Sequence, residues 1–251
     1  MTRYFVELAY HGGGYVGWQN QPGQVSVQSA IEGSLATLLR REVSVVGCGR
    51  TDTGVHARQY FLHFDWEGDF PDYFLSRVNK VLGPNIVLYR LFPVAAKWHA
   101  RYSATRRSYE YHLRLRKDPF SQQTAFLFPQ SKQLHFDALQ SAAALLMDYE
   151  LFFPFCKSKS DVKTMRCQLF RSEWERRSAD HWVFHISANR FLRGMVRLIV
   201  GMTLNVGTNK LALAQVKTAL DQQERLMKSY SVPPQGLFLS EVHYPDLVAS
   251  E

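Results

Sequence analysis

The loop at residues 47–57 combines three side chains that could take part in covalent or acid–base chemistry. Arg50, Asp52 and His56 lie within seven residues of one another, between two β-branched segments. Three glycines in this loop permit a tight backbone that can approach a substrate closely. A carboxylate held ionised by a nearby arginine can act as a nucleophile or a base, but not as a general acid at neutral pH. The alternative is a polar hairpin turn in which Asp52 bonds to the local backbone.

Three other segments carry residues suited to binding a polyanion. Residues 10–19 contain a triple glycine, which suits phosphate binding, although the Lys-Ser or Lys-Thr pair of a Walker loop does not follow. Residues 98–111 mix cations, hydroxyl groups and aromatic rings. Residues 189–201 place Arg193 and Arg197 four apart, hence on one face of a helix. Flexible connections and solvated faces are the alternative interpretation of these segments.

The charge of the 251-residue chain favours a nucleic-acid partner. Lys and Arg number 30 against 22 Asp and Glu, a net charge of +8. Residues 97–117 carry +6 and residues 163–197 carry +5, with aromatic residues interleaved in both. Basic groups bind backbone phosphates while aromatic faces stack on bases. The alternative is a set of solvated strand faces with core aromatics. The composition excludes a disordered chain, a collagen and a coiled coil.

Other kinds of chemistry lack their usual motifs. Three cysteines without a CxxC pair argue against a structural zinc and fit a reducing compartment. The chain contains no nucleophile elbow, no HExxH and no dinucleotide fingerprint. It also shows no signal-peptide pattern and no apolar run long enough to span a bilayer. We therefore expect a cytoplasmic protein without a metal, an organic cofactor or a membrane partner.

Hydrophobic periodicity predicts an α+β fold. Alternating or β-branched apolar residues predict strands at 3–10, 42–48, 59–65, 86–91, 108–115, 167–175, 181–188 and 236–244. Apolar stripes at helical spacing predict helices at 27–38, 71–82, 137–147, 191–206 and 213–220, with Ser26 as an N-cap and Pro71 as an opening residue. The strands come in hairpin-like pairs, which predicts a mainly antiparallel sheet in two comparable halves, 1–105 and 106–251.

Residues 49–57, Gly-Arg-Thr-Asp-Thr-Gly-Val-His-Ala, resemble the signature loop of the tRNA pseudouridine synthase A family. Residues 15–19, 99–105, 191–197 and 236–239 resemble other motifs of that family, in the family's order. One motif would be a weak signal, whereas five in order are specific. The resemblance extends from residue 4 to about residue 245, which is nearly the whole chain.

The resemblance implies isomerisation of uridine to pseudouridine in the anticodon stem-loop of tRNA, at tRNA positions 38–40. It implies a homodimer that needs no metal or organic cofactor. It also implies two ferredoxin-like, RRM-like halves that share one sheet, with helices on one face and a basic cleft. The alternative is a non-catalytic RNA-binding module derived from a synthase.

The resemblance also implies roles for individual residues. Asp52 matches the family's essential aspartate, and three routes stay open: attack on C6 of uracil, a covalent bond to C1′ of the ribose, or removal of a sugar proton. Arg197 matches the arginine that pairs with the aspartate. Tyr109 matches the pocket tyrosine, whose ring can stack on the flipped base. Arg50 is expected to bind the RNA by helping to extrude the nucleotide or by taking its place in the stem. The expected RNA contacts or loop braces are His56, Arg58, Arg101, Arg107 and Arg193.

The chain departs from the family pattern at three places. His11 stands where the family usually has an acid, and Thr53 where it has alanine. Residues 151–155, Leu-Phe-Phe-Pro-Phe, replace the family's Asp-Phe-Thr-Ser-Phe and keep only the two outer phenylalanines. This predicts an altered loop beside the pocket. Asp52, Tyr109 and Arg197 are all present, which predicts that activity is retained.

Overall fold

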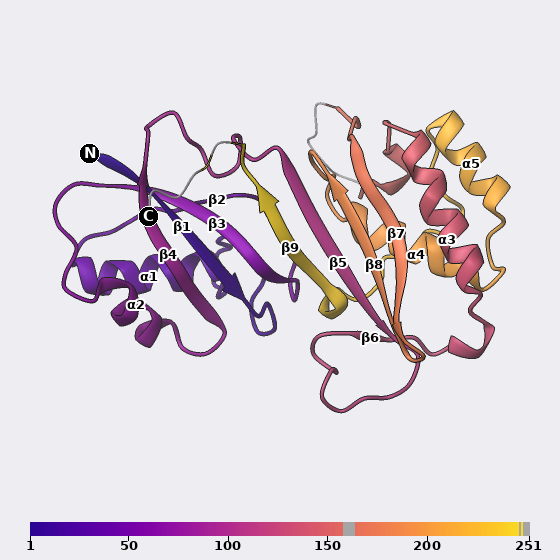
Figure 1. The fold of residues 1–251 in the computed structure, drawn as a ribbon, viewed down its shortest axis with the longest axis horizontal. Coiled ribbons are helices and arrows are strands. Elements are labelled where there is room, and N and C mark those ends of the chain that lie inside the picture. Colours follow the sequence, from indigo (N-terminus) through magenta and orange to yellow (C-terminus); the bar gives the residue numbers. More distant parts are fainter. Residues whose placement is uncertain (158–163, 246, 248–251) are drawn as a thin grey trace. The chain divides into compact units, whose positions relative to one another are not determined.

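The computed structural model describes residues 1–157, 164–245 and 247, and the chain divides into two compact units. Unit 1 consists of Met1–Thr105 together with the chain from Phe238 onward, and unit 2 is Arg106–Leu237 (Figure 1). Each unit mixes strands and helices, which confirms the predicted α+β class. Among the described residues, no helix is long and apolar enough to cross a membrane.

Unit 1 is built around the long strand β3. Its elements are β1 (Thr2–Tyr10), α1 (Val27–Leu39), β2 (Val46–Gly47), β3 (His56–Trp66), α2 (Phe74–Leu82), β4 (Ile86–Val94) and β9 (Leu237–His243). Strand β1 pairs antiparallel with β3 on one side and with β4 on the other, and β2 pairs antiparallel with β3. Helix α2 packs against β4, and α1 packs against α2.

The last strand joins unit 1 by pairing parallel with the start of β3, where His56 lies opposite Phe238 and Ala57 opposite Leu239. From sequence, these residues were assigned to the second half of the chain. Periodicity predicts that a segment is a strand, but it carries no information about which distant strand will be its partner.

The two helices of unit 1 begin for different reasons. Ser26 caps α1 as predicted: the Ser29 N–H donates to the Ser26 hydroxyl at 2.9 Å, and the Ser29 hydroxyl accepts from the Ser26 N–H at 3.0 Å. The prediction that α2 opens at Pro71 is wrong. The helix begins at Phe74 because Tyr73 has a left-handed backbone, with φ of 56°, which cannot belong to the helix.

Unit 2 is built around a three-stranded antiparallel core with β8 in the middle. Its elements are β5 (Arg106–Arg114), β6 (Phe126–Leu127), α3 (Phe136–Leu145), β7 (Leu169–Ser178), β8 (His181–Ala188), α4 (Met195–Gly207) and α5 (Leu213–Gln222). The short strand β6, which pairs parallel with β5, was not predicted. Helix α4 begins at Met195 instead of Phe191, because Gly194 before it has φ of +71°.

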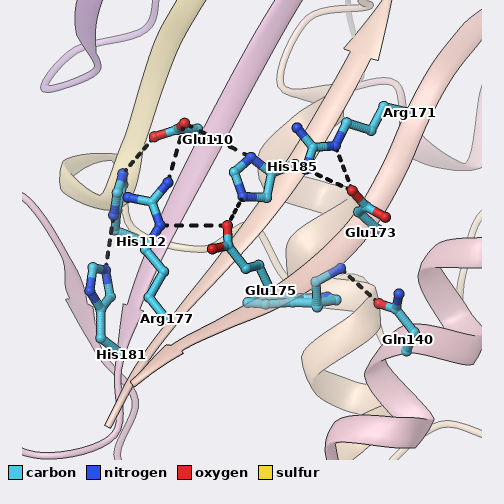
Figure 2. A network of polar contacts seen from close by, with 10 residues as sticks. Glu110, His112, Gln140, Arg171, Glu173, Glu175, Arg177, His181 and His185 are labelled. Carbon is cyan, nitrogen blue, oxygen red and sulfur yellow. Dashed lines mark hydrogen bonds and ion pairs between the residues drawn. The ribbon is translucent and has the colours of Figure 1, made fainter. Parts of the chain in front are cut away.

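A network of polar side chains lies across β5, β8 and β7 (Figure 2). His112 Nε2 donates to the Glu110 carboxylate at 3.1 Å, and Arg177 lies within 3.6 Å of the same carboxylate. Together with His185 these groups lower the pKa of Glu110 to about 2, against the opposing effect of burial. Burial, helped by nearby cations, lowers the pKa of His181 to about 4, and a hydrogen bond of 3.0 Å joins His181 Nε2 and His112 Nδ1. The network therefore pairs the polar groups of this strand face with one another.

Candidate active site

Hydrogen bonds at Thr51 join the Asp52 loop to the segment 10–19. The hydroxyl groups of Tyr10 and Thr51 lie 2.9 Å apart, and the Trp18 N–H donates to the Thr51 carbonyl at 3.3 Å. Beneath the loop, the Tyr60 hydroxyl donates to the Gly49 carbonyl at 2.5 Å. Two segments that the sequence marked separately, 10–19 and 47–57, therefore form one structure.

Two glycines make this close contact feasible. A Cβ atom on Gly17 would lie 2.3 Å from the Thr51 carbonyl oxygen, and Gly17 also has φ of +98°. A Cβ atom on Gly12 would lie 2.0 Å from the Val55 carbonyl oxygen. Side chains at either position would push the loop away. The glycines of the segment 10–19 thus serve backbone packing against the Asp52 loop.

Asp52 itself lies at the start of a short turn. The Val55 N–H donates to the Asp52 carbonyl at 3.1 Å, and the Gly54 between them has φ of +76°. The Asp52 side chain is half-buried, whereas Arg50 and Thr53 on either side are exposed. The loop therefore holds one carboxylate at the surface of unit 1, with a cation two residues away along the chain.

A stack of aromatic rings supports the loop from the core. The rings of Trp18 and Tyr60 are stacked with their centres 4.2 Å apart, and the Tyr10 ring meets Tyr60 edge-on at 5.5 Å. All three side chains are buried. The hydroxyls of Tyr10 and Tyr60 were missed as site residues because alternation marked them only as strand core. A buried tyrosine hydroxyl needs a hydrogen-bond partner, so a tyrosine at a predicted core position indicates a polar group nearby.

His56 is a brace in this structure. Its side chain is 1% exposed, and Nδ1 accepts a hydrogen bond from the Gly12 N–H at 3.0 Å. Its ring stacks on Phe238 at 4.5 Å and lies 4.4 Å from the ring of His11. Of the two roles expected for His56, RNA contact or loop brace, this geometry favours the brace. Arg58 is exposed and places its guanidinium 4.8 Å from the centre of the Phe238 ring.

A second turn of unit 1, residues 98–103, depends on two neutral histidines. His63 Nδ1 accepts from the Ala100 N–H at 3.1 Å, and His99 Nδ1 accepts from the N–H groups of Arg101 and Tyr102 at 3.1 and 3.3 Å. Each acceptor nitrogen must be unprotonated. Burial, with smaller effects from Arg3 and His99, lowers the pKa of His63 to about 4 against the opposing charge of Asp65. The pKa of His99 is lowered as well, mainly by burial.

We expect the stability of the protein to fall between pH 6.5 and pH 4 because of His63. Above pH 7.5 the imidazole is neutral whether the chain is folded or not. Below pH 6.5 the unfolded chain binds a proton that the folded chain refuses until about pH 4, which costs about 1 to 3 kcal/mol of unfolding free energy.

The variant His63→Asn isolates this effect, because the amide oxygen can accept from the Ala100 N–H without titrating in this range. Urea unfolding at pH 4.5 and pH 7.5 should show a smaller loss of stability for this variant than for the unmodified protein. An equal loss in both proteins would contradict the prediction.

In unit 2, residues from the segments 98–111 and 189–201 meet. Tyr109 lies on β5 opposite Ile186 of β8, and the Phe191 ring meets the Tyr109 ring edge-on at 5.1 Å. Arg107 Nη1 donates to the Asn189 carbonyl at 3.1 Å. Arg107 therefore braces the chain that leads from β8 toward α4.

Arg197 lies on α4, and hydrogen bonds with Val232 hold it in a defined orientation. Its Nε donates to the Val232 carbonyl at 2.7 Å, and its own carbonyl accepts from the Val232 N–H at 3.2 Å. Burial raises the pKa values of Tyr111 and Tyr230, and the charge of Arg197 opposes both shifts. Arg197 therefore lies among neutral phenols within unit 2. Arg193 is exposed and lies in the turn before α4, so the prediction that Arg193 and Arg197 share one face of a helix is wrong.

The segment that departs from the family pattern is ordered by its two retained phenylalanines. Phe152, just before the short 3₁₀ turn Phe153–Phe155, and Phe155, the last residue of that turn, are both fully buried. The Phe152 N–H donates to the Met165 carbonyl at 3.1 Å, and the Gln223 amide accepts from the Phe153 N–H at 3.3 Å. The retained rings are therefore core residues. Of the replaced positions, Leu151 is exposed, Phe153 is half-buried and Pro154 is buried.

The expected site residues are divided between the units. Unit 1 contains Arg50, Asp52, His56, Arg58 and Arg101, and unit 2 contains Tyr109, Arg107, Arg193 and Arg197. Within unit 1 the structure brings Asp52 next to the segment 10–19. Within unit 2 it joins the segments of Tyr109 and Phe191.

Comparison with known proteins extends the local similarity to nearly the whole chain. Residues 143–245 match a family model described as tRNA pseudouridine synthase. The chain is 41% identical to tRNA pseudouridine synthase A of Parabacteroides distasonis, with 98% of this chain and 97% of that protein covered. It is 42% identical to tRNA pseudouridine synthase A of Porphyromonas gingivalis, with 98% of both covered.

Among solved structures, a protein of unknown function from Galdieria sulphuraria aligns over 84% of this chain and 93% of that one. The sequence identity is 9% and the TM-score 0.22, so this likeness bears on neither fold nor function.

The family model over residues 143–245 and these relatives over nearly the whole chain place the protein in the pseudouridine synthase class. The near full-length identity narrows this further: the chain belongs to the tRNA pseudouridine synthase A family.

Proposed function

We propose that this protein isomerises uridine to pseudouridine in the anticodon stem-loop of tRNA, at tRNA positions 38–40, with Asp52 as the group that acts on the nucleoside. The observation that carries the proposal is 41% to 42% identity, over almost the whole chain, to proteins named tRNA pseudouridine synthase A. The Asp52 loop supports it, because close backbone contacts at Gly12 and Gly17 and the hydrogen bond from the Trp18 N–H to the Thr51 carbonyl hold this loop in place.

The reaction requires few groups from the protein. The N1–C1′ bond breaks, the uracil turns, and a bond forms between C5 and C1′. The proton on C5 is lost to solvent and N1 gains one, so the reaction is redox-neutral. A carboxylate in the place of Asp52 can serve by any of three routes: addition to C6, capture of C1′, or removal of a sugar proton. A half-buried position suits a nucleophile, because partial desolvation raises its reactivity while the extruded nucleoside can still reach it.

Tyr109 and Arg197 are proposed as the other two groups of the site. Tyr109 would stack on the uracil, and the edge-on contact with Phe191 supports this by holding its ring in one orientation. Arg197 would stabilise the carboxylate charge, and its bond to the Val232 carbonyl supports this by fixing the guanidinium. The proposed RNA contacts are the arginines at 50, 58, 101, 107 and 193, with His56 as a brace.

We further propose that the two units are ferredoxin-like halves. In unit 1 the element order β1-α1-β2-β3-α2-β4 and the strand order β4-β1-β3-β2 support this, because both are those of a ferredoxin-like half. A homodimer in the cytoplasm, whose halves carry helices on one face of a shared sheet, remains the expectation from family membership.

Release of tritium from tRNA labelled at C5 of uridine tests the proposed reaction, because C5 loses its hydrogen only when pseudouridine forms. We expect release from tRNA that carries uridine at positions 38–40, and little from tRNA with cytidine at all three. If the protein binds tRNA tightly but releases no tritium from any tRNA, the alternative of a non-catalytic RNA-binding module replaces this proposal.

A further inference from the structure

Tyr102 is an exposed aromatic residue on a firmly braced turn. The N–H groups of Ala100, Arg101 and Tyr102 all donate to imidazole nitrogens, as described above. The Tyr244 hydroxyl donates to the Ala100 carbonyl at 2.5 Å, and the Ser103 N–H donates to the His99 carbonyl at 2.9 Å. Few backbone groups in this turn can move without breaking one of these bonds.

The Tyr102 side chain is 75% exposed, although its ring is held in place. The His99 ring lies 4.4 Å from the Tyr102 ring, and the Arg101 guanidinium lies 5.6 Å from its centre. An aromatic ring in this position contributes little to the core. It is instead a rigid apolar surface next to a cation, and such a surface binds a nucleobase by stacking.

Arg101 connects this ring to the Asp52 loop. Arg101 and Arg50 both line an open cavity of about 160 Å³, together with Trp18, Gln19 and Gly49. All of these residues belong to unit 1. Two arginines around a small cavity suit a phosphate group, because each guanidinium group can donate two parallel hydrogen bonds to phosphate oxygens. The surface therefore continues from the proposed catalytic loop, through a cationic cavity, to the Tyr102 ring.

We propose that Tyr102 is a stacking platform for one unpaired base of the tRNA next to the target uridine, and that Arg50 and Arg101 hold the intervening phosphate in the cavity that they share. Extrusion of the target uridine leaves its neighbour without a stacking partner, and the Tyr102 ring replaces that partner. The choice of tRNA as the ligand rests on the proposed function. His99 and His63 are positioning residues, since they hold the turn and do not meet the base.

Binding of two RNA probes to Tyr102 variants tests this proposal. One probe is an anticodon stem-loop, and the other is a fully paired duplex with the same stem sequence. We expect Tyr102→Ala to weaken stem-loop binding by about 5- to 150-fold and duplex binding by less than about two-fold. Tyr102→Trp and Tyr102→Phe should retain stem-loop affinity, whereas Tyr102→Leu should lose it, because only a flat ring can stack.

Tyr73 provides a matched control, because it lies in unit 1, is 85% exposed and belongs to none of the proposed sites. Tyr73→Ala should leave both affinities unchanged. In tritium release, Tyr102→Ala should raise KM and leave kcat within about three-fold. The platform is refuted if stem-loop and duplex binding weaken equally, or if leucine substitutes for tyrosine. It is also refuted if Tyr102→Ala changes the oligomeric state in solution, which would assign the ring to a contact between copies.

The two proposals fail in different ways. If the unmodified protein releases tritium and Tyr102→Ala has no effect on affinity, the platform is wrong and the proposed reaction stands. If the unmodified protein releases none but Tyr102→Ala selectively weakens stem-loop binding, the reaction is wrong and the platform stands.

Discussion

Replacing Asp52 by asparagine is expected to reduce pseudouridine formation by at least about 1000-fold. The amide has nearly the shape of the carboxylate, but it has no negative charge to attack carbon or to remove a proton, and loss of a single essential nucleophile typically costs several powers of ten. Tritium release under single-turnover conditions measures the effect directly. tRNA affinity should stay within a few-fold, because removing a negative charge does not weaken contacts with phosphates.

Thr53→Ala is the matched control for this experiment. Thr53 is exposed in the same loop, next to Asp52, and alanine is the residue that the family resemblance implies there. This variant should keep its activity within about two-fold. Activity of Asp52→Asn within ten-fold of the unmodified protein would refute the role of Asp52. A large loss in Thr53→Ala would show that the loop backbone, instead of the carboxylate, is the sensitive feature.

Replacing Gly17 by alanine is expected to lower activity by about 100-fold without unfolding the protein. The new Cβ atom would lie 2.3 Å from the Thr51 carbonyl oxygen and 3.0 Å from the Asp52 carbonyl carbon. The loop must therefore move away by about 1 Å, and a displacement of this size at a reacting group can cost about 100-fold in rate. Single-turnover tritium release and a thermal unfolding curve measure activity and stability in the same preparation.

Gly14→Ala separates this displacement from backbone strain. Gly14 has a similar left-handed backbone, with φ of +89° against +98° at Gly17, but its Cβ atom would meet nothing within 4 Å. Both variants should lose about 1 to 2 kcal/mol of unfolding free energy from the strained φ. Only Gly17→Ala should lose most of its activity. Equal activity in the two variants would mean that contact with Gly17 does not position Asp52.

Local sequence patterns were sufficient for most of the secondary structure. Helix α1 begins where Ser26 predicts, and β8 covers the residues that alternation predicts. Periodicity placed the starts of α2 and α4 too early, at Pro71 and Phe191. The helices begin at Phe74 and Met195, because the residue before each of them has a left-handed backbone. Neither conformation has a reliable local signal when apolar periodicity continues through the boundary.

Local patterns could not predict the contacts that support the Asp52 loop. The sequence marked the segments 10–19 and 47–57 as separate candidates and suggested phosphate binding for the first. The structure shows Gly17 packed against Thr51 and the Tyr60 hydroxyl bonded to Gly49. Such contacts depend on how the strands pair and pack, and the residue type at either position does not encode them.

The amino-acid sequence by itself determined the α+β class, the approximate positions of most strands and helices, and the family, because periodicity and consecutive motif residues are local properties. The tertiary structure alone decided that β9 pairs with β3, that His56 faces Gly12, and that His63 supports the turn of Arg101. The physical reason is that buried polar groups must find partners, and only the packed chain defines which partners lie within reach.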